Sequence, residues 1–206
     1  DGGYIIIGTS DSTDVDITGN KGQYDFWIVK INASGSLVWE KSFGGTGIDE
    51  AYSVVEAENN NFMILGKTFS DDVDVSHNIG QADAWLIKID SNGTLLWEKT
   101  YGGSSFDSGH AITNSQDGGY IITGSSRSQD GDLSVNNGQN DVFILKISAT
   151  GDVQRGYSFG GTDADFSYGI IEKSNNEIIL VGETGSNDVD IIENKGFTDA
   201  LIAKLK

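Results

Sequence analysis

The chain has 206 residues and a formal net charge of −18, from 31 acidic and 13 basic side chains, and it contains neither cysteine nor proline. A field of this sign repels phosphate backbones and anionic lipids, so we expect no nucleic-acid partner and no membrane insertion. The lack of cysteine excludes disulfides, thiol nucleophiles and cysteine-bound zinc, and no apolar run approaches the roughly 18 residues that a membrane span needs.

One run of residues recurs every 58 positions without any insertion or deletion. The first copy is Asp25–Ile31, with the sequence Asp-Phe-Trp-Ile-Val-Lys-Ile, and later copies occupy 83–89, 141–147 and 199–205. A fixed period of this length indicates a repeat architecture, in which each unit buries its apolar faces against its neighbours.

Each repeat contains four strand-like runs separated by turn residues. The first, Tyr4–Gly8, ends in a glycine that returns in all four copies, which predicts a bulge or a close backbone approach. The second, 25–31, is apolar on both faces except for one lysine, as in a sheet packed on both sides. We expect these lysines to pair with a repeated acid or to reach solvent; they are Lys30, Lys88, Lys146 and Lys204.

The third run follows a tight turn, of which Asn92-Gly93 is the strongest hairpin signal. Its second copy, 95–101, carries a tryptophan in the middle, whereas the copy at 153–159 has Arg155 at that place. The substitution marks this position as tolerant or as part of an outer strand.

The fourth run, 51–55, follows the glycine-rich loop 44–49. His110 stands in this run where other copies have Tyr52 and Tyr168. Because the chain has only two histidines and neither recurs, we expect a strand residue near a central channel, not a metal ligand or a member of a catalytic triad.

Four strands per repeat predict an all-β fold, a β-propeller with four-stranded antiparallel blades. Residues 175–206 repeat residues 1–32, so both ends of the chain fall inside blades. We expect the chain to be part of a larger ring of about seven blades, in which further blades of the same protein or a second chain close its open edges. The alternative is an eight-bladed ring made from two chains. The expected divisions are a partial blade 1–48, blades 49–106 and 107–164, and a partial blade 165–206.

The loop before each lysine-bearing strand carries acids and an asparagine at constant spacing, which first reads Asp14-x-Asp16-x-x-x-Asn20-x-Gly22-x-x-Asp25. Calcium prefers clustered carboxylate and carbonyl oxygens, so such a loop could wrap one ion, although it lacks the EF-hand's constant sixth-position glycine and final glutamate. Alternatively, these side chains close turns by hydrogen bonds to the backbone. The calcium candidates are Asp14, Asp16, Asn20, Asp25, Asp72, Asp74, Asn78, Asp83, Asp130, Asp132, Asn136, Asp141, Asp188, Asp190, Asn194 and Asp199.

The repeat resembles the bacterial seven-bladed β-propeller (SBBP) repeat over essentially the whole chain. The resemblance is carried by Phe43-Gly-Gly-Thr-Gly-Ile-Asp49, Phe62-Met-Ile-Leu-Gly66 and Asp83-Ala-Trp-Leu-Ile-Lys88. It implies a secreted or cell-surface location, because similar repeats occur in large bacterial surface proteins beside adhesion modules.

The function expected from these features is that of a non-catalytic extracellular scaffold or interaction module that binds protein or carbohydrate. No residue is assigned to catalysis or cofactor binding, and calcium is the one ligand that the loops suggest. The alternative is part of a propeller enzyme, quinoprotein-like because 31–40 resembles the tail of a quinoprotein repeat, or glycan-active because Asp49 and Glu50 form an acid pair.

Overall fold

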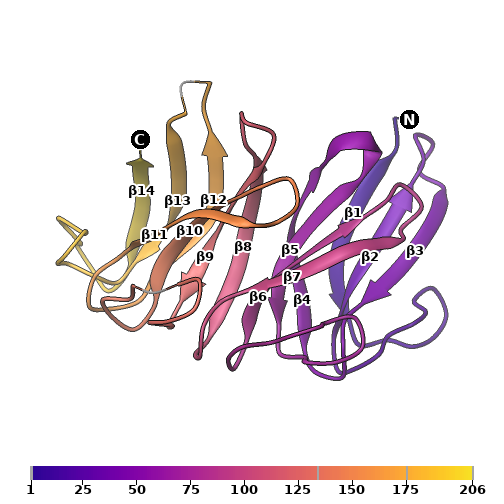
Figure 1. Cartoon of the computed structure of the whole chain (residues 1–206), viewed down its shortest axis with the longest axis horizontal. Helices are drawn as coiled ribbons and strands as arrows, with labels where there is room; N and C mark the ends of the chain where they lie inside the picture. The colour runs from indigo at the N-terminus through magenta and orange to yellow at the C-terminus, as the bar shows by residue number, and fades with distance from the viewer. Residues whose placement is uncertain (1, 134, 175, 206) are drawn as a thin grey trace.

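The computed structural model describes residues 2–133, 135–174 and 176–205, and it shows four antiparallel sheets in chain order. The sheets follow one another along the long axis of the molecule, with the two termini in the first and last sheets (Figure 1). The first sheet contains β1 (Tyr4–Ser10), β2 (Asp25–Ile31) and β3 (Leu37–Phe43). The second contains β4 (Asp49–Glu56), β5 (Phe62–Thr68), β6 (Asp83–Ile89) and β7 (Leu95–Tyr101).

The third and fourth sheets repeat this order. The third contains β8 (Asp107–Asn114), β9 (Tyr120–Ser126), β10 (Asp141–Ile147) and β11 (Val153–Phe159). The fourth contains β12 (Asp165–Glu172), β13 (Ile178–Thr184) and β14 (Asp199–Leu205). A 3₁₀ turn, η1 (Glu58–Asn60), joins β4 to β5, and no helix in the described part of the chain could span a membrane.

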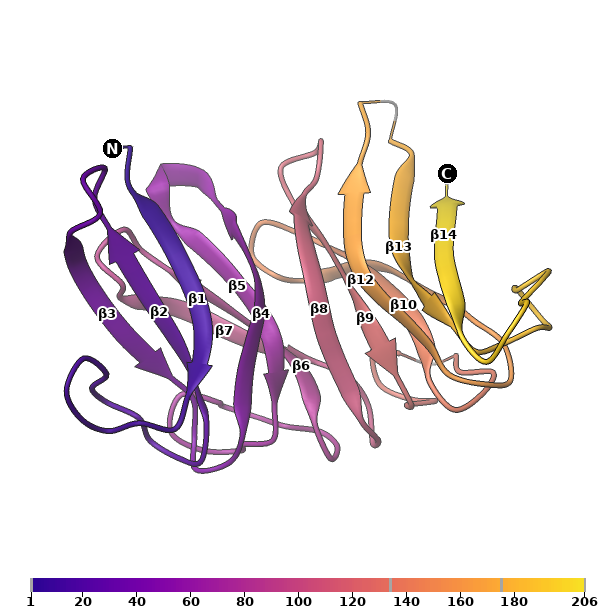
Figure 2. The same cartoon turned by 180° about the vertical axis from the view of Figure 1, so that it is seen from behind.

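The inner strands of successive sheets lie beside one another. Strand β8 contacts both β4 and β12, and Figure 2 shows these three strands running side by side. Within each sheet the chain then moves outward strand by strand, so each strand pairs with the next one in the sequence.

Three apolar cores fill the spaces between consecutive sheets. Phe26 of the first sheet packs with Trp85 of the second, Leu65 of the second with Phe143 of the third, and Ile144 of the third with the fourth. Both faces of a central sheet are therefore covered, which explains why every residue of β6 is buried. Strand β14 instead alternates between covered and open residues, because one of its faces has no neighbouring sheet among the described residues.

Antiparallel four-stranded sheets that stack face to face around their inner strands are the blades of a β-propeller. The predicted fold class is thereby confirmed. The recurring glycine of β5, β9 and β13 has the predicted close approach, since a Cβ on Gly66 would stand 1.9 Å from the carbonyl oxygen of Glu50. The same place holds the predicted bulge, because the pairing of β4 with β5 skips Tyr52.

Three of the repeated lysines pair with acids in the hairpin that connects the inner strand of a blade to the next strand. Lys88 pairs with Glu58, Lys146 with Asp117 at 2.8 Å, and Lys204 with Glu177 at 3.1 Å. Lys30 lies over the ring of Phe62 at 5.6 Å. The three acids occupy three different positions of the repeat, so the expectation of a repeated acid was wrong, and each lysine pairs with a different position of the hairpin.

Candidate functional site

A fully buried aspartate begins the inner strand of each blade. The carboxylate of Asp49 accepts hydrogen bonds from Thr68 Oγ1, from Ser70 Oγ at 2.9 Å and from the backbone N–H of Gly45 at 2.7 Å. One side chain thus ties the loop that enters the blade to the end of the neighbouring strand. Equivalent clusters surround Asp107 and Asp165.

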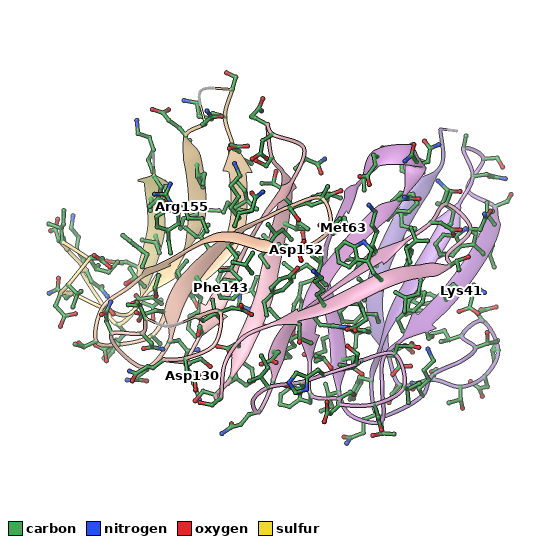
Figure 3. All side chains as sticks on the ribbon, in the orientation of Figure 1. Lys41, Met63, Asp130, Phe143, Asp152 and Arg155 are labelled. Atoms are coloured by element: carbon green, nitrogen blue, oxygen red, sulfur yellow. The ribbon has the colours of Figure 1, made fainter. Side chains whose placement is uncertain are left out.

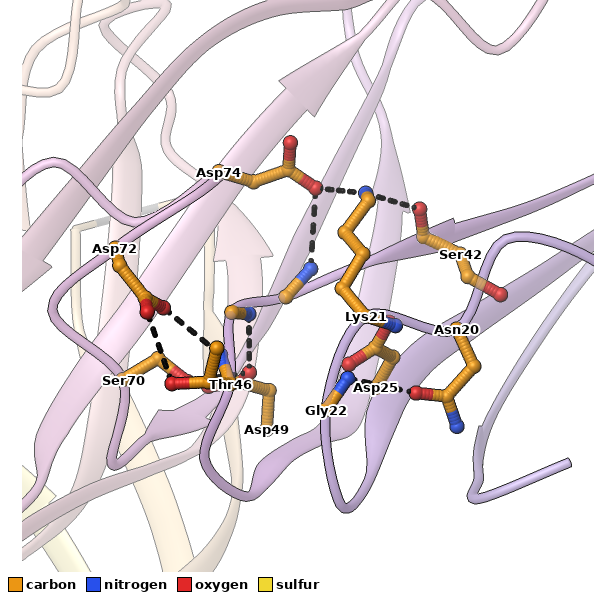
Figure 4. Close-up of polar contacts among 12 residues, drawn as sticks. Asn20, Lys21, Gly22, Asp25, Ser42, Thr46, Asp49, Ser70, Asp72 and Asp74 are labelled. Atoms are coloured by element: carbon orange, nitrogen blue, oxygen red, sulfur yellow. Dashed lines mark hydrogen bonds and ion pairs between the residues drawn. The ribbon is translucent and has the colours of Figure 1, made fainter. Parts of the chain in front are cut away.

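The first two aspartates of a predicted calcium loop bind the glycine-rich loop that enters the same blade (Figure 4). Asp72 accepts two hydrogen bonds of 2.8 Å from Thr46, one from its N–H and one from its hydroxyl. Asp74 accepts one of 3.1 Å from the N–H of Gly44 and pairs with Lys21. Equivalent bonds reach Asp130, Asp132, Asp188 and Asp190, whereas Asp14 and Asp16 of the first loop are exposed.

The other two predicted ligands close their own loop. Asn20 donates to the carbonyl of Ser10 and accepts from the N–H of Gly22, both at 2.9 Å. Asp25 Oδ2 accepts from the N–H of Lys21 at 2.7 Å. The same bonds are made by Asn78, Asn136 and Asn194, and by Asp83, Asp141 and Asp199.

These contacts separate the predicted ligands of one loop into two groups, one directed at the entering loop and one at the loop itself. Within the described residues, no three acidic or histidine side chains are arranged to hold a metal ion. The bonds of the asparagine and the last aspartate match the turn-closing alternative, whereas the first two aspartates join two loops, and calcium binding stays a prediction.

The last aspartate of the loop has one buried oxygen without a hydrogen-bond partner among the described residues. This atom is Oδ1 of Asp25, Asp83 and Asp141. Burial raises the pKa of Asp25 to about 6, and the nearby Asp49 carboxylate adds to the effect. Burial likewise raises the pKa values of Asp83 and Asp141 to about 6.

A second set of side chains lies on the inner strands, where the bulge positions form an aromatic row. The rings of Tyr52 and His110 lie 5.7 Å apart, and those of His110 and Tyr168 lie 5.5 Å apart. Tyr52 is 43% exposed and Tyr168 is 53% exposed. His110 Nδ1–H donates a 2.8 Å hydrogen bond to the carbonyl oxygen of Ser167, and burial lowers the pKa of His110.

Charged groups border this aromatic row. The hydroxyls of Tyr52 and Tyr168 each donate to a glutamate at 2.7 Å, Glu50 and Glu183 respectively. Lys67 pairs with Glu50 at 2.7 Å, and its ammonium lies within 5.8 Å of the ring centre of Tyr52. The surface therefore offers aromatic faces beside carboxylates, a combination suited to cations and planar groups.

Sequence reasoning placed His110 on an inner strand, but it considered Asp49 only as half of an acid pair with Glu50 and assigned no role to the hydroxyls around it. The sequence did contain a signal for this cluster, because every copy of the inner strand begins with Asp and every copy of the loop before it begins with a Gly-Gly pair. The Thr-x-Ser pattern at the end of β5, 68–70, recurs in the other copies as Ser-x-Ser or Thr-x-Ser. Their meeting across the blade required the tertiary fold.

Comparisons with known proteins give two partial likenesses. No protein-family model matches the chain. An alignment 169 residues long, which covers 75% of this chain and 17% of the other protein, shows 27% identity to the regulatory protein FlaEY of Caulobacter vibrioides. It is also similar to the WD40 domain of Neurospora crassa Pan2, with 12% identity and a TM-score of 0.49, over 91% of this chain and 47% of that one.

Proposed function

We propose that this β-propeller segment is a non-catalytic interaction module of a secreted or cell-surface protein, and that the aromatic row binds a basic segment of a partner protein. The observation that carries the proposal is the row of Tyr52, His110 and Tyr168 across three blades, in which the two tyrosines are about half exposed. Aromatic side chains, tyrosine in particular, are enriched at the centres of protein interfaces.

The charge of the chain favours a basic partner. Arginine and lysine side chains can lie over tyrosine rings and pair with the carboxylate of Glu183 beside Tyr168, whereas Glu50 already pairs with Lys67. A formal charge of −18 would also speed the encounter with a basic segment at low salt. The SBBP-like repeat supports the extracellular location, and in this proposal further blades, from the same protein or a second chain, continue the ring.

Fluorescence anisotropy with defined probes tests the binding. Labelled peptides of mixed arginine and aromatic composition are compared with acidic peptides of equal length, and a panel of neutral and acidic oligosaccharides tests the carbohydrate alternative. We expect binding of the basic peptides, weakening with salt, and a loss of at least about tenfold in the double variant Tyr52→Ala, Tyr168→Ala.

A matched control removes two exposed apolar side chains from the outer strand β3. Leu37 and Val38 are 61% and 54% exposed, and the variant Leu37→Ala, Val38→Ala should bind like the wild type. Equal weakening in both double variants, or binding of oligosaccharides in place of peptides, would contradict the proposal. Detection of the native protein in washed-cell and medium fractions tests the location.

A further inference from the structure

A cavity of about 180 Å³ lies between the outer strand β11 of the third sheet and the loop that precedes β10. Leu133 and Val135 of the loop form one wall, and Gly156 and Ser158 of β11 form the other. Phe143 of β10, labelled in Figure 3, also lines the space. Phe143 and Leu133 are 1% and 5% exposed, whereas Val135 is 54% exposed, so the cavity has an apolar floor and an open rim.

In the second sheet a tryptophan and a glutamate fill the same place. Trp85 stands at the repeat position of Phe143, and Glu98 stands at that of Gly156. Trp85 Nε1 donates a 2.8 Å hydrogen bond to the carboxylate of Glu98, whose other oxygen accepts from the hydroxyl of Ser76 in the loop. The pair thus bridges the space between the loop and the outer strand.

The first sheet contains the same bridge. Trp27 Nε1 donates to Glu40 at 3.3 Å, and Thr18 of the loop donates to the same carboxylate at 2.5 Å. The third sheet has a phenylalanine and a glycine at these two positions, and both line the cavity. Together the two substitutions remove about as many atoms as a small aromatic ring contains, which makes the emptied space a candidate site for such a ring.

The cavity lies on the face of the third sheet that is turned toward the second sheet. Phe143 and Leu133 belong to the core between these two sheets, together with Leu65 of β5. A Cβ on Gly156 would stand 3.0 Å from Leu145, another residue of this core. All four strands of both sheets are among the described residues, so the strands that border the cavity are in place.

A hydrogen-bond acceptor faces the cavity at the point where the second sheet carries Glu98. The carbonyl oxygen of Asp132 lies 3.7 Å from the position that a Cβ on Gly156 would occupy. Phe143 has no ring N–H and cannot supply the donor that Trp85 supplies in the second sheet. An aromatic ligand with its own N–H can take the place of that donor and bind this carbonyl oxygen.

We propose that this cavity binds a small heteroaromatic ring that carries an N–H group, of about the size of indole. An apolar cavity of roughly 150 Å³ holds benzene, so a cavity of about 180 Å³ suits one ring or two small fused rings. Phe143 and Leu133 contact the ring, and the carbonyl oxygen of Asp132 accepts its N–H. The site lies in the outer part of the third blade and does not depend on the partner proposed for the aromatic row.

The ring can belong to a free heteroaromatic molecule or to a tryptophan side chain of a partner segment. Titrations of the isotope-labelled whole chain with indole, and with a capped Gly-Trp-Gly peptide, cover both sources when the backbone amide signals are followed by NMR. Benzothiophene has nearly the same shape as indole but no N–H, so it isolates the hydrogen bond. Tighter binding of the peptide than of indole would identify a partner's side chain as the ligand, and the reverse a free ring.

Two variants fill the cavity. The double variant Phe143→Trp, Gly156→Glu restores the pair of the second sheet, and Phe143→Trp alone adds the ring without crowding Leu145. Val38→Trp is the matched control, because it adds an indole ring at an exposed position of β3 in the first sheet. Thermal melting of each variant verifies that the fold is kept.

The reverse double variant, Trp85→Phe with Glu98→Gly, transfers the substitutions of the third sheet to the second. It should open a second cavity between the loop before β6 and the outer strand β7. A second set of ligand-induced shifts, at Val75 and at position 98, should then accompany the set at Leu133 and Gly156.

We expect indole to shift the amide signals of Leu133, Val135 and Gly156 and to bind about fivefold more tightly than benzothiophene, which is the contribution of one hydrogen bond. Both filled variants should lose at least about tenfold in affinity because the ring can no longer be buried, and Val38→Trp should bind like the wild type. No shifts at these residues, equal affinity for the two rings, unchanged binding in the filled variants, or no second site in the transferred variant would overturn the proposal.

Discussion

The carboxyl groups of Asp25 and Asp49, which begin strands in neighbouring sheets, converge on Gly44. A Cβ on Gly44 would stand 2.6 Å from Asp25 Oδ1 and 2.6 Å from Asp49 Oδ2. A glycine is therefore needed at this position because a side chain would clash with the two carboxylates, and not because of its backbone angles. The same convergence occurs at Gly102 and Gly160, so the first glycine of the Gly-Gly pair marks each passage from one blade to the next.

Gly44→Ala should destabilise the chain by about 2–3 kcal/mol, because the added methyl group overpacks a buried junction that contains two carboxylates. Urea denaturation followed by tryptophan fluorescence measures the change. Gly196→Ala is the matched control, since a Cβ there would meet no atom within 4 Å. A loss of equal size in both variants would show that the close approach at Gly44 does not matter.

Ser128→Ala tests the hydroxyl cluster around the buried aspartate of the third sheet. Ser128 Oγ donates to Asp107 at 2.7 Å and accepts from the N–H of Ser105 at 3.0 Å. Its removal leaves both groups short of a partner, so we expect a loss of about 2–3 kcal/mol in the free energy of unfolding. Ser34→Ala, in an exposed turn, should change it by less than about 0.5 kcal/mol. Similar small changes in both variants would contradict the role of the cluster.

His110 should make the folded state less stable as the pH falls. Burial lowers the pKa of His110 in the folded state below its usual value of about 6.5, so the folded state favours the neutral ring. Its contribution to stability is fully present above pH 6.5 and is lost as the pH falls from there through the folded-state pKa. In His110→Tyr, which restores the residue of the other copies, the fall in stability between pH 7 and pH 5 should be smaller than in the wild type. Denaturation curves at both pH values measure the difference between the two proteins, and parallel curves would refute the assignment.

The strands follow directly from the sequence, because the 58-residue repeat keeps strand, turn and strand in fixed register and the apolar runs match a sheet covered on both faces. The bulge was predictable from the recurring glycine, whose lack of a Cβ admits the carbonyl of Glu50. The partners of the lysines were not, because Glu58, Asp117 and Glu177 reach them from three different positions of one hairpin. Flexible long side chains can satisfy the same charge from several backbone positions, and no repeat pattern reveals this.

The polar loops illustrate a second limit of the sequence. Constant spacing of Asp72, Asp74, Asn78 and Asp83 suggests ligands of one ion, but the fold directs the first two toward the entering loop. A spacing pattern records that side chains recur and does not record where their partners lie.

Calcium binding and turn closure predict opposite results for the loop residues, and the observed hydrogen bonds favour turn closure. We therefore expect the midpoint of thermal melting to be the same in 5 mM calcium, a concentration of about the order at which weak extracellular sites fill, and in chelator. A calcium site predicts a rise of several degrees with calcium.

The variant Asp83→Asn distinguishes calcium binding from turn closure at one loop residue. The amide oxygen can keep the hydrogen bond that Asp83 Oδ2 accepts from the N–H of Ile79 at 2.7 Å, and the amide nitrogen can replace the unpartnered Oδ1 beside the carboxylate of Asp107. Turn closure thus predicts a midpoint equal to or above that of the wild type in both buffers, because a buried charge is removed and a donor is gained. Loss of a carboxylate ligand would instead lower the midpoint in calcium alone, and that result, together with a calcium-dependent wild type, would establish the loops as metal sites.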